Sequence, residues 1–325
     1  MFEPVTCPCI HPHRSQMPAA SSPGPIAIIG AGAVGTTLAR SLTANGQRIE
    51  AVVSRDEEEA QDLADRVGAP VAGATAAVLP PSIRFVLICV PDDAIAGVAE
   101  ALSRRDHPWE KTVAAHTSGA RRAAVLTPLD QRGAATMSFH PVQTFTPETP
   151  PEALEGIAVG LEGEDRAIAA GTALAEALGA RPVRLTAGEK ARVHCAAALA
   201  SNGLVALLSV VEEVFGASEA NLSQGAGTDL VAPLVEHTWA NLKEGSPEEV
   251  LTGPVRRGDV GTVQAHLDAL DDETPHLVPF YTALSTEMVR VAVRGGHLSR
   301  EQAEALLAVL RTAATASEEA AGGAR

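Results

Sequence analysis

Lysine and cysteine are both scarce in this chain of 325 residues. Only three lysines occur, Lys111, Lys190 and Lys243, and the formal net charge is −15. Such an acidic balance excludes the broad basic surface that nucleic-acid-binding proteins carry, although it permits a local phosphate site. The four cysteines form no disulfide framework, so we expect a reducing, cytoplasmic environment.

Uninterrupted apolar runs of membrane length are also lacking, since the best one, Ala196 to Val211, is broken by Ser201 and Asn202. We therefore predict no membrane segment, and the N-terminus lacks the charged and apolar regions of a signal peptide. Residues 1–24 are rich in proline and serine, and we predict a disordered tail there. Their Cys7-x-Cys9-x-His11-x-His13 cluster could bind a metal, but its spacing fits no closed structural site, so no metal is predicted.

The length and the hydrophobic fraction of 46% predict two folded domains. Residues 25–186 alternate strand and helix patterns, which is typical of a Rossmann-type, doubly wound parallel sheet in an α/β domain. The expected strands are 26–29, 48–53, 70–72, 85–90, 112–115 and 135–139, followed by a strand–helix–strand unit over 156–185. Residues 187–318 show only helical periodicity, so an all-α C-terminal domain is expected there.

A glycine-rich motif, Gly30-Ala31-Gly32-Ala33-Val34-Gly35, follows the first expected strand and precedes a helix-like segment. In that context the Gly-x-Gly-x-x-Gly pattern indicates a dinucleotide-binding turn. Gly30 would make the tight turn, Gly32 would admit a pyrophosphate, and Gly35 would let the helix pack closely on the strand. The pyrophosphate would lie at the helix N-terminus, where N–H groups and the dipole favour an anion. The alternative is a glycine-rich turn that binds nothing.

The end of the second expected strand favours NADP over NAD. NAD-dependent enzymes usually place an acidic residue here, to hold the ribose 2′-hydroxyl. This chain instead has Ser54 and Arg55, a hydroxyl and a guanidinium that suit a 2′-phosphate. An acid remains nearby, at Asp56 and Glu57. The alternative is that Ser54 only caps the helix that begins near Glu57.

Polar residues also follow two later strands of the expected sheet. His116 and Ser118 come directly after strand 112–115, and His140 comes directly after strand 135–139. The carboxyl ends of parallel strands are where α/β sheets bind their ligands. We therefore expect these residues to line the wall that receives the nicotinamide and the substrate.

The first helix of the C-terminal domain adds three polar residues on one line. His194 and Ser201 follow Lys190 by four and eleven residues, which places the three close together on one face of a helix. Their neighbours are mostly Ala, Leu and Val. A lysine on an apolar helix indicates a functional role. The alternatives are a solvated first turn for Lys190 and a hydrogen-bonded core histidine for His194.

Two arginines further along the chain could hold a substrate carboxylate. Arg256 and Arg257 precede an expected helix, and a guanidinium pairs with a carboxylate through two hydrogen bonds. Asp259 follows them and is a weaker candidate for the substrate site. The alternative for Asp259 is that it caps the helix that begins beside it.

In combination these motifs resemble a family of bacterial Rossmann-like oxidoreductases whose C-terminal helical domain is catalogued as being of unknown function. The family is similar in layout to 6-phosphogluconate dehydrogenase, pyrroline-5-carboxylate reductase and ketopantoate reductase. The resemblance implies an NADP-binding domain, contacts of Val90 and Pro91 with the cofactor, and a helical domain that forms a homodimer. Its other motif residues are His116-Thr117-Ser118-Gly119, His140-Pro141, Gln143-Thr144-Phe145, Lys190, His194, Asn202 and Gly253 to Asp259.

The function predicted from these features is hydride transfer between NADPH and a small carbonyl, such as the 2-oxo acid ketopantoate, or an imine. Lys190 is the expected proton donor, tuned or replaced by His194, while His116 and Ser118 orient the substrate. In the hydroxy-acid branch of the similar enzymes, Asn stands four residues after the lysine, and here His194 takes that position. The alternatives are a non-catalytic NADP(H)-binding redox sensor and a deazaflavin-dependent enzyme on the same fold.

Overall fold

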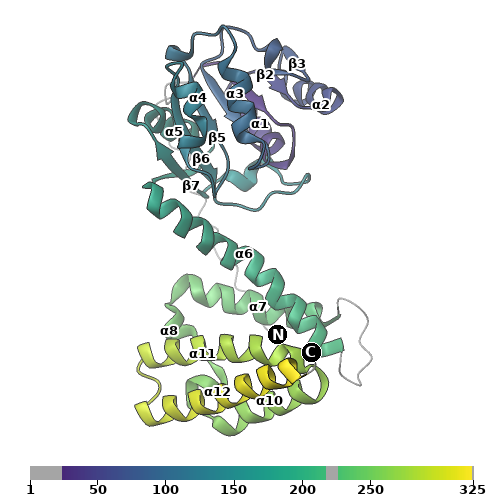
Figure 1. Cartoon of the computed structure of the whole chain (residues 1–325), viewed down its shortest axis with the longest axis vertical. Coiled ribbons are helices and arrows are strands. Elements are labelled where there is room, and N and C mark those ends of the chain that lie inside the picture. The colour runs from purple at the N-terminus through teal and green to yellow at the C-terminus, as the bar shows by residue number, and fades with distance from the viewer. Residues whose placement is uncertain (1–23, 217–225, 324–325) are drawn as a thin grey trace, which may run out of the picture. The chain divides into compact units, whose positions relative to one another are not determined.

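The structure is a computed structural model that describes residues 24–216 and 226–323 (Figure 1). These residues fall into two compact units, Met1–Leu199 and Ala200–Arg325. Apart from Gly24, the tail predicted over residues 1–24, with its Cys7 to His13 cluster, lies outside the described residues. The boundary between the units lies inside one long helix, whereas the sequence-based boundary at 186/187 lies at the start of that helix.

An eight-stranded sheet in the order β3-β2-β1-β4-β5-β6-β7-β8 forms the first unit. Its strands are β1 (Ile26–Ile29), β2 (Ile49–Val53), β3 (Val71–Gly73), β4 (Phe85–Ile88), β5 (Val113–His116), β6 (Ala135–Pro141), β7 (Ala158–Gly163) and β8 (Arg181–Arg184). The helices are α1 (Ala33–Ala44), α2 (Glu57–Val67), α3 (Ile95–Ser103), α4 (Thr127–Asp130) and α5 (Asp165–Ala177). The α/β class with a Rossmann-type sheet is therefore confirmed.

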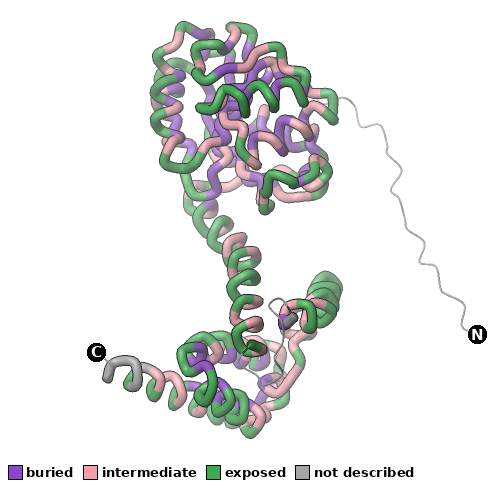
Figure 2. Tube along the Cα trace, turned by 90° about the vertical axis from the view of Figure 1, so that its right-hand side faces the viewer, coloured by how far each residue is buried: buried purple, intermediate pink, exposed green. Residues whose placement is uncertain are grey.

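The central strands β1 and β4 are apolar throughout because both faces of the sheet are covered. All four residues of β4 are fully buried, and successive residues enter different clusters. Phe85 and Leu87 pack in the cluster that includes residues of α1, α2 and α5, whereas Val86 and Ile88 pack in the cluster that includes α3. This alternation follows from the two-residue period of a strand. In Figure 2 the buried positions accordingly gather in the interior of this unit.

One pairing departs from the expected parallel sheet. β6 pairs with β7 in the antiparallel sense, and β8 then runs parallel to β7. A parallel pair needs a crossover, which is usually a helix. The segment between β6 and β7 contains only a short 3₁₀ turn at Pro151–Leu154, so the chain returns antiparallel instead.

In its described residues the second unit contains helices and no strand, which confirms the all-α expectation. Besides the last part of α6 (Ala187–Gly216), it contains α7 (Ala226–Glu244), α8 (Pro247–Val250), α9 (Gly253–Arg257), α10 (Val260–Glu273), α11 (Val278–Arg294) and α12 (Arg300–Gly323). Its core joins side chains of α10, α11 and α12. Its buried members include Val263, Leu267, Val289, Leu306 and Leu310.

Helix α6 contains the apolar stretch from Ala196 to Val211, in which no membrane segment was predicted. Ser201 and Asn202 lie within it and do not interrupt it. It is the one helix of the described residues that is long and apolar enough to cross a membrane. Length and composition alone are weak evidence of a membrane segment, because helices of soluble proteins pass the same test.

Candidate functional site: a dinucleotide pocket beside a lysine-centred hollow

The glycine-rich turn has the backbone geometry that a dinucleotide site requires. Gly30 ends β1 with a φ of +108°, which L side chains rarely adopt, and its N–H donates to Val53 O at 2.7 Å. A Cβ at Gly35 would overlap the carbonyl of Gly30, so only glycine lets α1 approach the turn this closely. A Cβ at Gly32 would meet nothing within 4 Å, because this residue faces open space.

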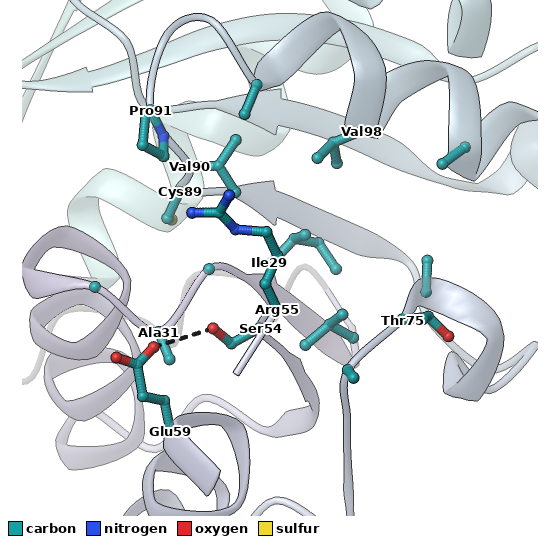
Figure 3. A pocket seen from close by; sticks show the side chains of 17 residues that line it. Ile29, Ala31, Ser54, Arg55, Glu59, Thr75, Cys89, Val90, Pro91 and Val98 are labelled. Atoms are coloured by element: carbon teal, nitrogen blue, oxygen red, sulfur yellow. Dashed lines mark hydrogen bonds between the residues drawn. The ribbon is translucent and has the colours of Figure 1, made fainter. Parts of the chain in front are cut away.

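That open space is a pocket of about 470 Å³ at the carboxyl ends of β1, β2 and β4 (Figure 3). The turn residues Gly30, Ala31 and Gly32 form one wall. The opposite wall comes from Val90 and Pro91, as the family resemblance implied, together with Cys89, Ala94 and Val98. The helix N-terminus that begins at Ala33 has no side-chain cap, so its N–H groups are available to an anion.

Three side chains form the polar rim of this pocket at the end of β2. Ser54 and Arg55, the residues expected to hold a 2′-phosphate, both line it, and Glu59 of α2 joins them. The Ser54 hydroxyl donates to Glu59 Oε2 at 3.2 Å. Asp56 caps α2, since its carboxylate accepts from the N–H groups of Glu58 and Glu59, so Ser54 is not the cap.

A smaller hollow of about 250 Å³ shares Val90 with the dinucleotide pocket. Val34 at the start of α1 also lines it, so the hollow adjoins the glycine-rich turn. Its polar residues come from the ends of β4, β5 and β6. They are Asp92, Thr117, Ser118, His140 and Gln143.

Lys190 lies behind this hollow and is only 2% exposed. This burial excludes the alternative that Lys190 belongs to a solvated first turn of its helix. Its Nζ donates to Ser118 O at 2.7 Å and to Ser138 Oγ at 2.5 Å. Burial lowers the pKa of Lys190 from 10.5 to about 8, and the carboxylates of Glu162 and Asp92 oppose part of that effect. A lysine in this state can give up and regain a proton near neutral pH.

His116 is fully buried, and the backbone engages both of its ring nitrogens. Ser118 N donates to Nδ1 at 3.2 Å, so Nδ1 is the acceptor and Nε2–H donates to Arg122 O at 3.2 Å. Burial, followed by the charge of Lys190, lowers the pKa of His116 to about 4. His116 therefore ties the end of β5 to the loop that carries Ser118 and Arg122.

The Ser118 side chain faces the hollow from the same loop. Its Oγ accepts hydrogen bonds from Ala120 N at 3.1 Å and Arg121 N at 2.9 Å. With both lone pairs engaged, the hydroxyl has only its own hydrogen left to bond, as a donor. Ser118 therefore presents a hydroxyl donor on one side of the loop, while its carbonyl holds Lys190 on the other.

Two imidazoles lie over Gly119. The rings of His140 and His194 are 5.7 Å apart between centroids and meet edge to face at 72°. A Cβ at Gly119 would overlap His194 Nδ1 and come within 2.7 Å of His140 Nε2, so both nitrogens approach this glycine. Burial, with Lys190 nearby, lowers the pKa of His140 to about 4. His194 itself is exposed, which excludes a core histidine.

The other predicted site residues belong to the second unit. Asp259 caps α10, because its carboxylate accepts from Thr262 N at 3.0 Å and from Thr262 Oγ1 at 2.7 Å. Arg256 and Arg257 form the last turn of α9. Ser201 and Asn202 lie on α6, where Ser201 is half-buried and Asn202 is exposed. Among residues 24–216 and 226–323, no group of three or more His, Cys, Asp or Glu side chains is arranged to hold a metal.

Three residues were not among the predicted site residues: Glu59 and Asp92, which line the two cavities, and Ser138, which bonds to Lys190. Two of them had a signal. Glu59 is the third residue after the cap Asp56, a position whose side chain turns back toward the helix start. Ser138 pairs in register with His116 on the neighbouring strand. It also lies two residues before His140, so the side chains of Ser138 and His140 lie on the same face of the sheet.

Comparisons with known proteins match both halves of the chain. Residues 15–141 match a Rossmann-like domain, and residues 157–288 match a domain of unknown function, DUF2520. None of the curated proteins compared with the chain matches it.

Solved structures share this architecture. A protein from Bacteroides fragilis described as a “putative NADP oxidoreductase” is 26% identical, with a TM-score of 0.67, and the match covers 82% of this chain and 98% of that one. A protein from Thermotoga maritima is also 26% identical, with a TM-score of 0.66 over 83% and 98% of the two chains. An imine reductase from Myxococcus stipitatus in complex with NADP⁺ is 17% identical, with a TM-score of 0.55 over 90% and 94%, and shares the fold.

Proposed function

This chain joins a Rossmann-like domain to a DUF2520 domain, and we propose that it is an NADP-dependent oxidoreductase acting on a small carbonyl or imine. The observation that carries the proposal is the adjacency of two cavities within the first unit. A pocket built on Gly30, Gly32 and Gly35 shares Val90 with a hollow that Ser118 lines and Lys190 backs. Hydride transfer needs a dinucleotide beside a proton donor, and this arrangement offers both.

Within this proposal, NADPH would be held by the glycine-rich turn at its pyrophosphate and by Ser54 and Arg55 at its 2′-phosphate. The α1 N-terminus and the Arg55 guanidinium both suit anionic groups. The likeness to the Bacteroides fragilis protein supports the choice of NADP. When bound, the cofactor supplies the hydride, and the remaining steps belong to the protein.

Lys190 would supply the proton that neutralises the reduced oxygen or nitrogen and would become a neutral amine, while Ser118 would orient the reacting group through a hydrogen bond. Ser118 Oγ accepts from two backbone N–H groups, which leaves its hydrogen free to donate. The Lys190 ammonium, bonded to Ser118 O and Ser138 Oγ, places a positive charge behind that hydroxyl. A developing negative charge in the hollow would be stabilised by this charge in a poorly solvated setting. His140 and His194 would limit the hollow above Gly119 and select substrates by shape.

The test is consumption of NADPH at 340 nm against a panel of 2-oxo acids, with ketopantoate included, and cyclic imines, with NADH run in parallel. Turnover of one compound that falls at least about a hundredfold in Lys190→Met would support the assignment. Arg311→Met is the matched control, because it removes an exposed cation from α12. Full turnover in both Lys190→Met and His194→Ala would contradict it. Binding of NADPH without turnover of any compound would favour the redox-sensor alternative, and no binding would overturn the dinucleotide site.

We also propose that the helical unit pairs with a second copy of the chain. Large apolar side chains are exposed on its helices, including Val205 on α6 and Leu230, Leu234 and Trp239 on α7, each at least 60% exposed. Contiguous exposed apolar surface is typical of an interface. Light scattering after size-exclusion chromatography should give twice the chain mass of 33.4 kDa, and a monomer would refute the pairing.

A further inference from the structure

The rim at the end of β2 contains a carboxylate that a simple 2′-phosphate site would not include. Glu59 lines the dinucleotide pocket from α2 and also lines a second, open hollow with Ser54, Arg55, Asp56 and Glu57. In Figure 3 its carboxylate lies beside the Ser54 hydroxyl, at the edge near Ala31. In its hydrogen bond of 3.2 Å to Glu59, Ser54 therefore uses the hydroxyl hydrogen that it would otherwise donate to a phosphate oxygen.

Charge at this rim opposes a 2′-phosphate as much as it favours one. Arg55 is followed by four acids, Asp56 to Glu59. Asp56 is committed to the cap of α2, and Glu58 lines neither cavity. Glu59 is the acid that both lines the dinucleotide pocket and bonds to Ser54, so it is the one placed to repel a phosphate.

We propose that Glu59 is the residue that sets the choice between NADP(H) and NAD(H). Acids that hold the ribose 2′-hydroxyl of NAD usually end the second strand, and here Glu59 supplies the carboxylate from the following helix. With NADH, Glu59 accepts a hydrogen bond from the ribose hydroxyl. With NADPH, the Ser54–Glu59 bond opens, Ser54 donates to the phosphate and Arg55 pairs with it. The pocket therefore binds both dinucleotides, and Glu59 lowers the preference for NADPH.

This inference rests on the proposed function, because it requires that the pocket bind a nicotinamide dinucleotide. The experiment measures dissociation constants of NADPH and NADH by their fluorescence, with no substrate present, for the wild type, Glu59→Gln and Glu58→Gln. The Glu58 variant is the matched control, since it removes the same charge one residue away from the rim. Arg55→Gln is the reciprocal variant.

We expect Glu59→Gln to tighten NADPH binding about fivefold to tenfold, the size expected for removing one partly screened charge beside a phosphate. NADH binding should weaken or stay unchanged, so the ratio of the two constants moves toward NADPH. Glu58→Gln should change that ratio less than about twofold. Arg55→Gln should weaken NADPH at least about tenfold and leave NADH close to the wild type.

Two outcomes would overturn the inference while leaving the proposed function intact. One is an unchanged ratio in Glu59→Gln with NADPH still bound. The other is an equal shift of the ratio in Glu59→Gln and Glu58→Gln, which would indicate long-range charge alone. If the wild type binds neither dinucleotide, the proposed function fails first and this inference fails with it.

Discussion

Replacing Lys190 with methionine should raise the stability of the first unit at neutral pH while removing the proton donor. Burial holds the pKa of Lys190 near 8 instead of 10.5. At 1.36 kcal/mol per pH unit, keeping this side chain charged in the folded state costs about 3 kcal/mol below pH 8. A methionine side chain at this position would have a similar length and no charge.

The hydrogen bonds that the substitution removes offset part of this gain. Lys190 Nζ donates to Ser118 O and Ser138 Oγ, and each bond contributes about 1 kcal/mol. Neither acceptor is left alone, because Ser138 Oγ also donates to Ser118 O at 3.3 Å. The variant should therefore be about 1 kcal/mol more stable than the wild type at pH 7.

The pH dependence is the sharper part of this prediction. Between pH 8 and 10.5 the unfolded wild type keeps the lysine proton that the folded state has lost, so wild-type stability rises with pH. The variant lacks this rise. Its advantage should fall by about 2 kcal/mol between pH 7 and pH 9.5 and reverse in sign.

Urea unfolding followed by Trp109 fluorescence measures this, because Trp109 is 1% exposed in the first unit. A Trp239→Phe background removes the other tryptophan, which lies in the second unit. A difference between variant and wild type that stays constant from pH 7 to 9.5 would refute the reasoning, since Lys190 would then be titrating as an ordinary exposed lysine.

Three further outcomes are expected. Gly35→Ala should abolish NADPH fluorescence enhancement and cost about 2 kcal/mol or more in urea unfolding, because its Cβ overlaps the Gly30 carbonyl; normal binding would show that α1 can shift. Gly119→Ala should reduce turnover at least about tenfold with NADPH affinity retained, because the methyl group displaces His140 and His194. An equal loss of turnover and of NADPH affinity would indicate misfolding instead. The rate of reduction should fall as pH rises through about 8, as Lys190 loses its proton, and a flat profile to pH 10 would argue against its role.

Local patterns predicted the fold well because each central strand carries its own signal. A run such as Phe85 to Ile88, apolar at every position, is characteristic of a strand buried on both faces. The antiparallel β7 was not predicted, because strand direction depends on whether the preceding connection crosses the sheet. Residues 142–157 give no periodic pattern that decides this.

The sequence indicated which residues gather around the hollow better than it indicated what each of them contacts. Lys190 and Ser118 are 72 residues apart, and only tertiary packing brings the lysine to the Ser118 carbonyl. The role of His116 depends on which backbone groups meet its two nitrogens, and sequence spacing does not show this. Glu59 escaped because a helix and a strand end converge on one rim, and neither segment alone carries that information.

The two histidines beside Lys190 have a consequence for how the protein responds to acidity. The chain has ten histidines, the side chain that normally senses pH near neutrality. His116 and His140, the two beside Lys190, have a pKa of about 4 and stay uncharged throughout that range. A moderate acidification of the cell would therefore leave these two imidazoles neutral and Lys190 protonated. The inner side of the hollow keeps these charges under conditions in which most histidine sites change theirs.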